Sequence, residues 1–259
     1  MTQYTDLDPS ARTLLGAGPS MVSPRVLRAL AHPLVGHLDP QFIELMNEVQ
    51  ELLRFVFQTG NRLTIPVSGT GSAAMEAALC NFIEPGDSVL IGVNGYFGER
   101  LCDMASRYGG QVRRIERPWG DVFSVEDIEK ALRDKPATIV ALVHAETSTG
   151  ACQPMEGMAD VVHRYGGLLV MDCVTSLGGI PVTVDAWGVD VAYSGSQKCL
   201  SCPPGLGPLT VSPQAVEVLR RRRTQVPNWY LDLTLIEKYW GSQRTYHHTA
   251  PISMNYALR

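Results

Sequence analysis

Residues 138–172 read TIVALVHAETSTGACQPMEGMADVVHRYGGLLVMD. Two apolar runs, TIVALVH (138–144) and LLVMD (168–172), lie on either side of a stretch with helical composition over residues 154–165. Both runs are apolar on both faces, as strands buried in a parallel sheet are, and parallel strands require a long connection such as a helix. This segment therefore predicts one βαβ unit.

The same alternation continues in both directions along the chain. Further strands are predicted over residues 63–67, 88–93, 111–116, 189–196 and 207–212, with helices over residues 40–58, 72–83, 98–108, 124–133 and 213–222. An irregular tail is expected from residue 224. Strands that alternate with helices predict an α/β fold with a mostly parallel central sheet and helices on both faces.

Composition limits the class of protein. The 259 residues are 45% hydrophobic and 19% charged, which is enough chain for one large domain or slightly more. A net charge of -4 gives no basic surface for nucleic acid or an anionic membrane. The apolar runs are shorter than the ~20 residues that a bilayer requires, the polar start does not resemble a signal peptide, and the six cysteines are too sparse for a disulfide scaffold. We expect a soluble, cytoplasmic protein.

Polar residues follow four of the predicted strands. Ligands of open α/β sheets bind beyond the carboxyl ends of the strands, so these residues are candidates for a site. The turn SGTGSAA (68–74) opens a helix and suits a phosphate, and ETSTG (146–150) is a loop rich in hydroxyl groups. Asp172 closes one apolar run, where a carboxylate is costly unless it is paired, and Lys198 follows another run as a candidate reactive amine.

These four strand ends match the requirements of pyridoxal phosphate. They offer a phosphate-binding turn, an acid for the pyridine nitrogen, a hydroxyl for the ring oxygen and a lysine for the aldehyde. An alternative is a nicotinamide oxidoreductase, because Gly69, Gly71 and Ala74 also fit the dinucleotide fingerprint. That fingerprint requires an acid at the end of the next strand, whereas Asp87 precedes it. Cys199 and Cys202 form a CxxC pair, but without a second pair we expect no metal site.

Seven blocks of the sequence carry a resemblance to a known family. In order, they are SGTGSAAMEAAL (68–79), EPGD (84–87), NGYFGER (94–100), ETSTG (146–150), LLVMDCVTSLGG (168–179), YSGSQK (193–198) and RTYHHTAP (244–251). Together they resemble the class V aminotransferases of fold type I, and within that family the alanine–glyoxylate and serine–pyruvate group. The resemblance covers nearly the whole chain.

The resemblance implies a role for each matching residue. Lys198 would form the Schiff base with the cofactor, and Asp172 would pair with its pyridine nitrogen. The other cofactor contacts implied are Thr70, Gly71, Ser72 and Gln197 at the phosphate, Phe97 and Val174 on the two faces of the ring, Thr147 near the ring oxygen, and Tyr246 and Thr249 at the phosphate of the neighbouring subunit. A homodimer with shared sites follows, and LLGAGPS (14–20) would lie at the substrate entrance.

The resemblance also implies an organisation and an activity. Residues 1–20 would form an N-terminal arm, residues 21–250 the cofactor-binding domain, and residues 251–259 the start of a small domain. In the family, the arginine that holds the substrate carboxylate lies beyond residue 259, so we expect efficient turnover to need that continuation. The implied activity is ping-pong transamination between alanine or serine and glyoxylate or pyruvate.

Three other functions remain as alternatives to this one. An aminophosphonate aminotransferase belongs to the same family and is not separated from the proposal by the sequence. A cysteine desulfurase is disfavoured, because its stacking histidine and the histidine before its lysine are here Phe97 and Gln197. A non-catalytic protein that only dimerises is the alternative outside the enzymes.

Overall fold

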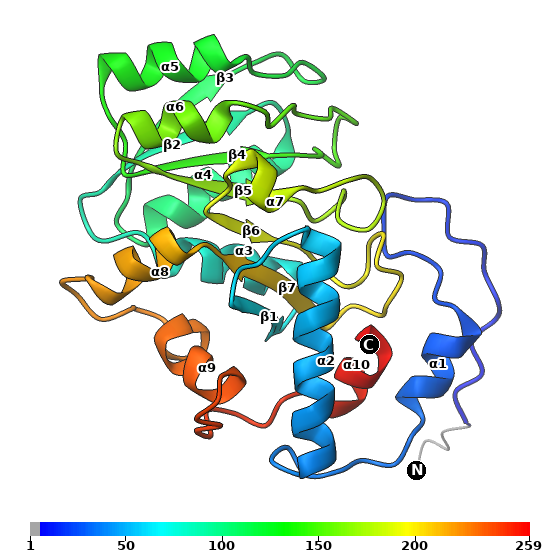
Figure 1. The fold of residues 1–259 in the computed structure, drawn as a ribbon. Helices are drawn as coiled ribbons and strands as arrows, with labels where there is room; N and C mark the ends of the chain where they lie inside the picture. The colour runs from blue at the N-terminus through cyan, green and yellow to red at the C-terminus, as the bar shows by residue number, and fades with distance from the viewer. Residues whose placement is uncertain (1–5) are drawn as a thin grey trace, which may run out of the picture.

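The computed structural model describes residues 6–259, and their strands form one seven-stranded sheet (Figure 1). The strands are β1 (Leu63–Ser68), β2 (Ser88–Val93), β3 (Gln111–Glu116), β4 (Ile139–Val143), β5 (Leu168–Asp172), β6 (Val191–Tyr193) and β7 (Leu206–Val211), in the spatial order β1-β7-β6-β5-β4-β2-β3. Residues 1–5, which were predicted to begin the N-terminal arm, lie outside the described residues.

β7 alone runs against its neighbours. It pairs antiparallel with both β1 and β6, whereas β2, β3, β4, β5 and β6 pair parallel with one another. The predicted mostly parallel sheet is therefore confirmed. Because six strands point the same way, their carboxyl ends lie at one edge of the sheet, and the register sets Val143 opposite Asp172 and Asp172 opposite Tyr193.

Helices cover both faces of this sheet, as predicted. They are α1 (Pro24–Leu30), α2 (Pro40–Phe57), α3 (Gly71–Cys80), α4 (Tyr96–Arg107), α5 (Val125–Asp134), α6 (Met158–Arg164), α7 (Val184–Trp187), α8 (Pro213–Arg220), α9 (Leu233–Trp240) and α10 (Ile252–Leu258), with a 3-10 turn at Trp229–Leu231. In Figure 1, α5, α6 and α7 lie on one face and α3 and α4 on the other, while α1 packs against α10 beside the sheet.

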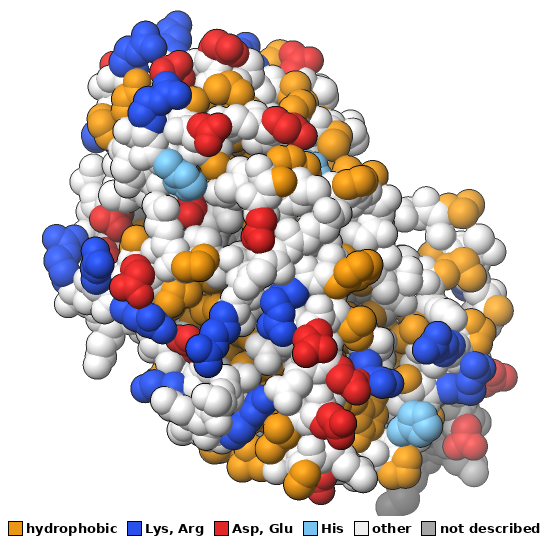
Figure 2. All heavy atoms as spheres, viewed as in Figure 1, with side chains coloured by type: hydrophobic (Ala, Val, Ile, Leu, Met, Phe, Trp, Pro, Cys, Tyr) orange, Lys and Arg blue, Asp and Glu red, His pale blue; other side chains and the backbone are white. Residues whose placement is uncertain are grey.

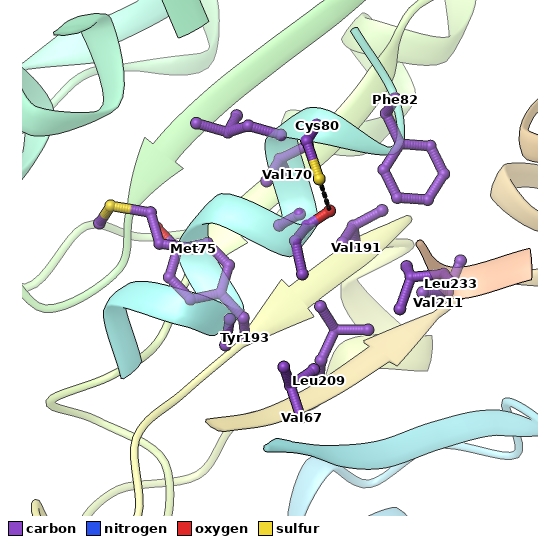
Figure 3. Close-up of a cluster of buried hydrophobic side chains, with 14 of the residues drawn as sticks. Val67, Met75, Cys80, Phe82, Val170, Val191, Tyr193, Leu209, Val211 and Leu233 are labelled. Atoms are coloured by element: carbon purple, nitrogen blue, oxygen red, sulfur yellow. Dashed lines mark hydrogen bonds between the residues drawn. The ribbon is translucent and has the colours of Figure 1, made fainter. Parts of the chain in front are cut away.

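Two hydrophobic clusters, one on each face, hold these layers together. Alternate residues of β4 enter opposite clusters: Ile139, Ala141 and Val143 face one, and Val140 and Leu142 face the other. Strands buried on both sides in this way are the reason that the sequence shows continuous apolar runs. Figure 3 shows part of the first cluster, in which side chains of α3 meet those of β5, β6 and β7.

Small residues let α3 lie close to the sheet. A Cβ atom at Gly207 of β7 would stand 2.6 Å from the Cβ of Ala74, so the glycine is required for this contact. Gly69 has a φ of +146°, in the region that favours glycine, and it turns the chain from β1 into the helix. The turn that was predicted to bind phosphate is thereby fixed at the carboxyl edge of the sheet.

The prediction of an irregular tail from residue 224 is wrong. Asp232 caps α9, and Leu233, Ile236 and Trp240 recur at helical spacing and are buried. Some other predicted boundaries are too long: α6 starts only at Met158, after Gly157 in the left-handed conformation, and β6 pairs only over residues 191–193. No helix among residues 6–259 is long and apolar enough to cross a membrane.

Candidate active site

Asp172 ends β5 at the carboxyl edge of the sheet and is buried, with 2% of its surface exposed. Its Oδ1 accepts a hydrogen bond from Val174 N at 2.9 Å, and its Oδ2 accepts one from the Tyr193 hydroxyl at 2.8 Å. Burial raises the pKa of Asp172 to about 6, against the opposing effect of these two donors. Within residues 6–259 no Lys, Arg or His nitrogen lies within 4.0 Å of this carboxylate, so a cationic ligand group would find a partner here.

Lys198 follows β6 and is half-buried at the same edge. Its Nζ donates a hydrogen bond to Ala17 O at 2.7 Å. Burial lowers the pKa of Lys198, and the attraction of Asp172 partly opposes this effect. A lowered pKa increases the fraction of neutral amine, which is the form that attacks an aldehyde.

The N-terminal segment LLGAGPS (14–20) contacts Lys198 and the residue before it. The Ser20 hydroxyl donates to Lys198 O at 2.8 Å, and Ser20 N donates to Gln197 O at 2.8 Å. A Cβ atom at Gly18 would stand 2.6 Å from Lys198 Cδ. The structure therefore places residues 17–20 against the candidate reactive amine.

The predicted phosphate turn lies beside the chain that leads to Lys198. A Cβ atom at Gly71 would stand 3.4 Å from Gly195 Cα and 3.6 Å from Val174 Cγ2, so the glycine brings the start of α3 close to both loops. Thr70 and Ser72 are exposed at this helix start, where free N–H groups favour an anion. Among the described residues, Gln197 Oε1 is buried without a hydrogen-bond partner, as a group that awaits a ligand would be.

Phe97 is half-buried at the start of α4, and its backbone N–H is bound by the loop that follows β4. Phe97 N donates to Glu146 Oε2 at 3.1 Å, and Glu146 Oε1 accepts from the Ser148 hydroxyl at 2.6 Å. A Cβ atom at Gly95 would stand 2.3 Å from Glu146 Cγ, so this approach requires glycine. The loop after β4 and the start of α4 are thereby joined.

Thr147 and Val174, predicted at the ring oxygen and at a ring face, come from adjacent loops. The Thr147 hydroxyl is hydrogen-bonded to that of Thr175, the residue after Val174. Val174 N also donates to the carboxylate of Asp172, so the loops that follow β4 and β5 are joined to each other beside the end of β5.

Tyr246 and Thr249 are both exposed. The Tyr246 ring instead packs against His37, with centroids 5.1 Å apart. Between the two residues, His248 binds the Ser68 hydroxyl at 2.6 Å and so fixes the segment to the end of β1.

Two residues of this site are not among those predicted from the sequence. Tyr193 is the hydroxyl donor to Asp172, and burial raises its own pKa well above the ordinary value. Glu146 is 1% exposed and anchors Phe97. A tyrosine and an acid close to the ends of apolar strands could have indicated them. Their hydrogen-bond partners, however, depend on the strand register and on the conformation of the loops.

The arrangement fits pyridoxal phosphate. Among residues 6–259, the buried Asp172 has no cationic partner and Gln197 Oε1 has no hydrogen-bond partner, and Gly71 leaves room at a helix start. Together with the half-buried Lys198, these features match a cofactor that carries a protonated ring, an aldehyde and a phosphate. The CxxC pair is not part of the site: Cys199 is exposed, Cys202 is buried, and within the described range no group of acids, histidines and cysteines has the arrangement of a metal site.

Comparison with known proteins agrees with this geometry. The sequence profile of the family described as aminotransferase class V matches residues 13–254. The alanine–glyoxylate aminotransferase of Rattus norvegicus is 41% identical over 251 residues, which cover 96% of this chain and 61% of that protein. The (S)-ureidoglycine–glyoxylate transaminase of Bacillus subtilis is 40% identical over 277 residues, which cover 100% of this chain and 67% of that protein.

A solved structure is also close. The crystal structure of an alanine–glyoxylate aminotransferase from Nostoc sp. matches with a TM-score of 0.98 and 60% identity, covering 99% of this chain and 68% of that one. This chain thus spans 61% of the length of the first curated relative that it matches.

Proposed function

Because this chain belongs to the class V aminotransferases, a family of pyridoxal phosphate enzymes, we propose that it transfers an amino group from alanine or serine to glyoxylate or pyruvate in a ping-pong reaction. The observation that supports the proposal most directly is that two ionisable groups, a carboxylate and an amine, lie at the same edge of the sheet. Asp172 is a buried carboxylate without a cationic partner among residues 6–259, and Lys198 has a lowered pKa.

The residues of this chain suit the separate tasks of transamination. When bound, the cofactor supplies a conjugated ring that accepts the electron pair of the broken Cα–H bond. Asp172 would hold a proton on the ring nitrogen, and Tyr193 and Val174 N keep its carboxylate in place. The Lys198 amine would bind the aldehyde covalently and, once released by substrate, carry the proton to and from Cα.

The remaining residues would bind and orient. Thr70, Gly71, Ser72 and Gln197 would hold the phosphate, Phe97 and Val174 the ring faces, and Thr147 the ring oxygen. Tyr246 and Thr249 would complete the site of a second subunit, and their exposed side chains are open to a contact between subunits. The division into an arm, a cofactor domain over residues 21–250 and a small domain remains a proposal, as does the cytoplasmic location.

Glyoxylate is the acceptor that we favour. Both the rat and the Bacillus subtilis relatives are named for glyoxylate, whereas their named amino donors are alanine and (S)-ureidoglycine. Ureidoglycine is therefore a third candidate donor, beside alanine and serine. The similarity at 40–41% identity to these enzymes gives no support to a nicotinamide oxidoreductase, a cysteine desulfurase or a non-catalytic protein.

Separate half-reactions test the proposal. The cofactor-loaded protein is mixed with alanine, serine or ureidoglycine without an acceptor, and the 2-oxo acid that is released is quantified. Glyoxylate is then added, and glycine is measured. We expect about one equivalent of oxo acid per site in the first step and one of glycine in the second. Failure of all three donors to release an oxo acid, in a protein that also carries the substrate-carboxylate arginine expected beyond residue 259, would refute the proposed activity.

A further inference from the structure

The sequence-predicted phosphate site contains no cation. Thr70, Gly71, Ser72 and Gln197 are neutral, as are Tyr246 and Thr249, which would come from a second subunit. A phosphate group carries roughly 1.5 to 2 negative charges at neutral pH, while the start of a helix such as α3 provides only about half a positive charge. The phosphate of the cofactor therefore needs a further positive group.

Arg100 is the cation that the fold brings to this turn. It lies one turn into α4, and its Nη1 donates a hydrogen bond to the Ser72 hydroxyl at 3.3 Å. Its guanidinium carbon lies 4.9 Å from the centroid of the Phe97 ring and 5.2 Å from that of Tyr96, within the range of a cation–π contact. One side chain thus touches two residues that the family resemblance assigns to the cofactor.

The charge of Arg100 is free to act on a ligand. Within residues 6–259, no carboxylate lies within 4.0 Å of its guanidinium. Its neighbours differ, because Arg107 on the same helix pairs with Asp103 at 3.1 Å and Arg114 pairs with Glu116 at 3.0 Å. The aromatic rings hold the guanidinium in place without neutralising it.

We propose that Arg100 is the positioning cation of the phosphate site and that it acts through the hydroxyl of Ser72. This inference rests on the proposed function. A hydroxyl has a single hydrogen, and when its oxygen accepts a bond from Arg100, that hydrogen is directed elsewhere and can be donated to a phosphate oxygen. A donor that is itself bound by a cation is more polarised and binds an anion more strongly. The contact with the Phe97 ring holds the same guanidinium beside Ser72.

Comparison of pyridoxal phosphate with pyridoxal tests this role. Dissociation constants for both ligands are measured on the wild-type protein and on Arg100→Gln, Arg100→Lys and the control Arg107→Gln. We expect Arg100→Gln to weaken pyridoxal phosphate by roughly ten- to a hundredfold, the range for loss of a hydrogen bond to a charged group. Binding of pyridoxal, which lacks the phosphate, should stay within about twofold. Arg100→Lys should recover part of the loss, and Arg107→Gln should match the wild type.

A double-mutant cycle tests the route through Ser72. In a Ser72→Ala background, Arg100→Gln should cost much less affinity than it does in the wild type, because the bond between the two is already absent. An equal loss for both ligands, an unchanged affinity for pyridoxal phosphate, or additive losses in the cycle would each overturn the inference. A wild-type protein that binds neither ligand would instead refute the proposed function, so the two failures are distinguishable.

Discussion

Replacement of Asp172 by asparagine should stabilise the cofactor-free protein above pH 6 and abolish transamination. The pKa of Asp172 is about 6 in the folded protein against an ordinary value of 3.8, so the folded state binds this proton more tightly than the unfolded state does. Stability consequently falls as the pH rises from about 4 to about 6. At 1.36 kcal/mol for each pKa unit, the loss is about 3 kcal/mol of unfolding free energy.

Asparagine has the same shape but does not ionise. Its carbonyl oxygen can accept from Val174 N, and its amide can donate to the Tyr193 hydroxyl, so both hydrogen bonds can be kept. Asp172→Asn should therefore equal the wild type near pH 4 and exceed it by up to about 3 kcal/mol at pH 8.

Urea unfolding of the cofactor-free proteins at pH values from 4 to 8 measures this difference. The matched control is Asp103→Asn, which makes the same replacement at an exposed carboxylate paired with Arg107 and should give no gain of stability at pH 8, because an exposed ion pair contributes little. Parallel stability curves for Asp172→Asn and the wild type would refute the reasoning. In the loaded protein, the variant should keep its label on Lys198 and lose most turnover, because the ring nitrogen has no partner to keep it protonated.

Three further perturbations follow from the site. Tyr193→Phe removes a hydrogen-bond donor to the Asp172 carboxylate. In the same unfolding series, the pH at the midpoint of the protein's stability loss should rise by about one unit. An unchanged midpoint would show that the hydroxyl does not hold the carboxylate. Dilution to monomers should release cofactor if Tyr246 and Thr249 complete a shared site, whereas equal affinity above and below the dissociation range would exclude sharing. Gly95→Ala would set a Cβ atom 2.3 Å from Glu146 Cγ, so it should lower the free energy of unfolding by about 1–3 kcal/mol and displace Phe97. Gly36→Ala, at a position without such a close neighbour, is the control. Wild-type stability and cofactor binding in Gly95→Ala would contradict this contact.

Much of the fold was readable because a parallel sheet leaves a local trace. Strands buried on both faces are continuously apolar. Because ligands bind beyond the carboxyl ends of such strands, the sequence alone indicates Asp172 and Lys198 as candidate site residues. The helix α9 is missed by the sequence prediction, although Leu233, Ile236 and Trp240 recur at helical spacing after the cap Asp232. The polar residues around them obscure this pattern.

Other parts of the site have no local trace. Tyr193 meets Asp172 only because the two lie side by side in the register of β5 and β6. Glu146 reaches the start of α4 across 49 positions of sequence, and Arg100 reaches Ser72 across 28. Such partnerships depend on loop paths and strand register, and the spacing of a single sequence does not encode them.

Borohydride reduction followed by peptide mapping tests the central claim most directly. The purified protein is loaded with pyridoxal phosphate, its absorbance is recorded before and after reduction, and the labelled peptide is identified. The account predicts one pyridoxyl group per chain on Lys198, and none after Lys198→Ala. A label on another lysine, or no reducible cofactor at all in the wild-type protein, would contradict it.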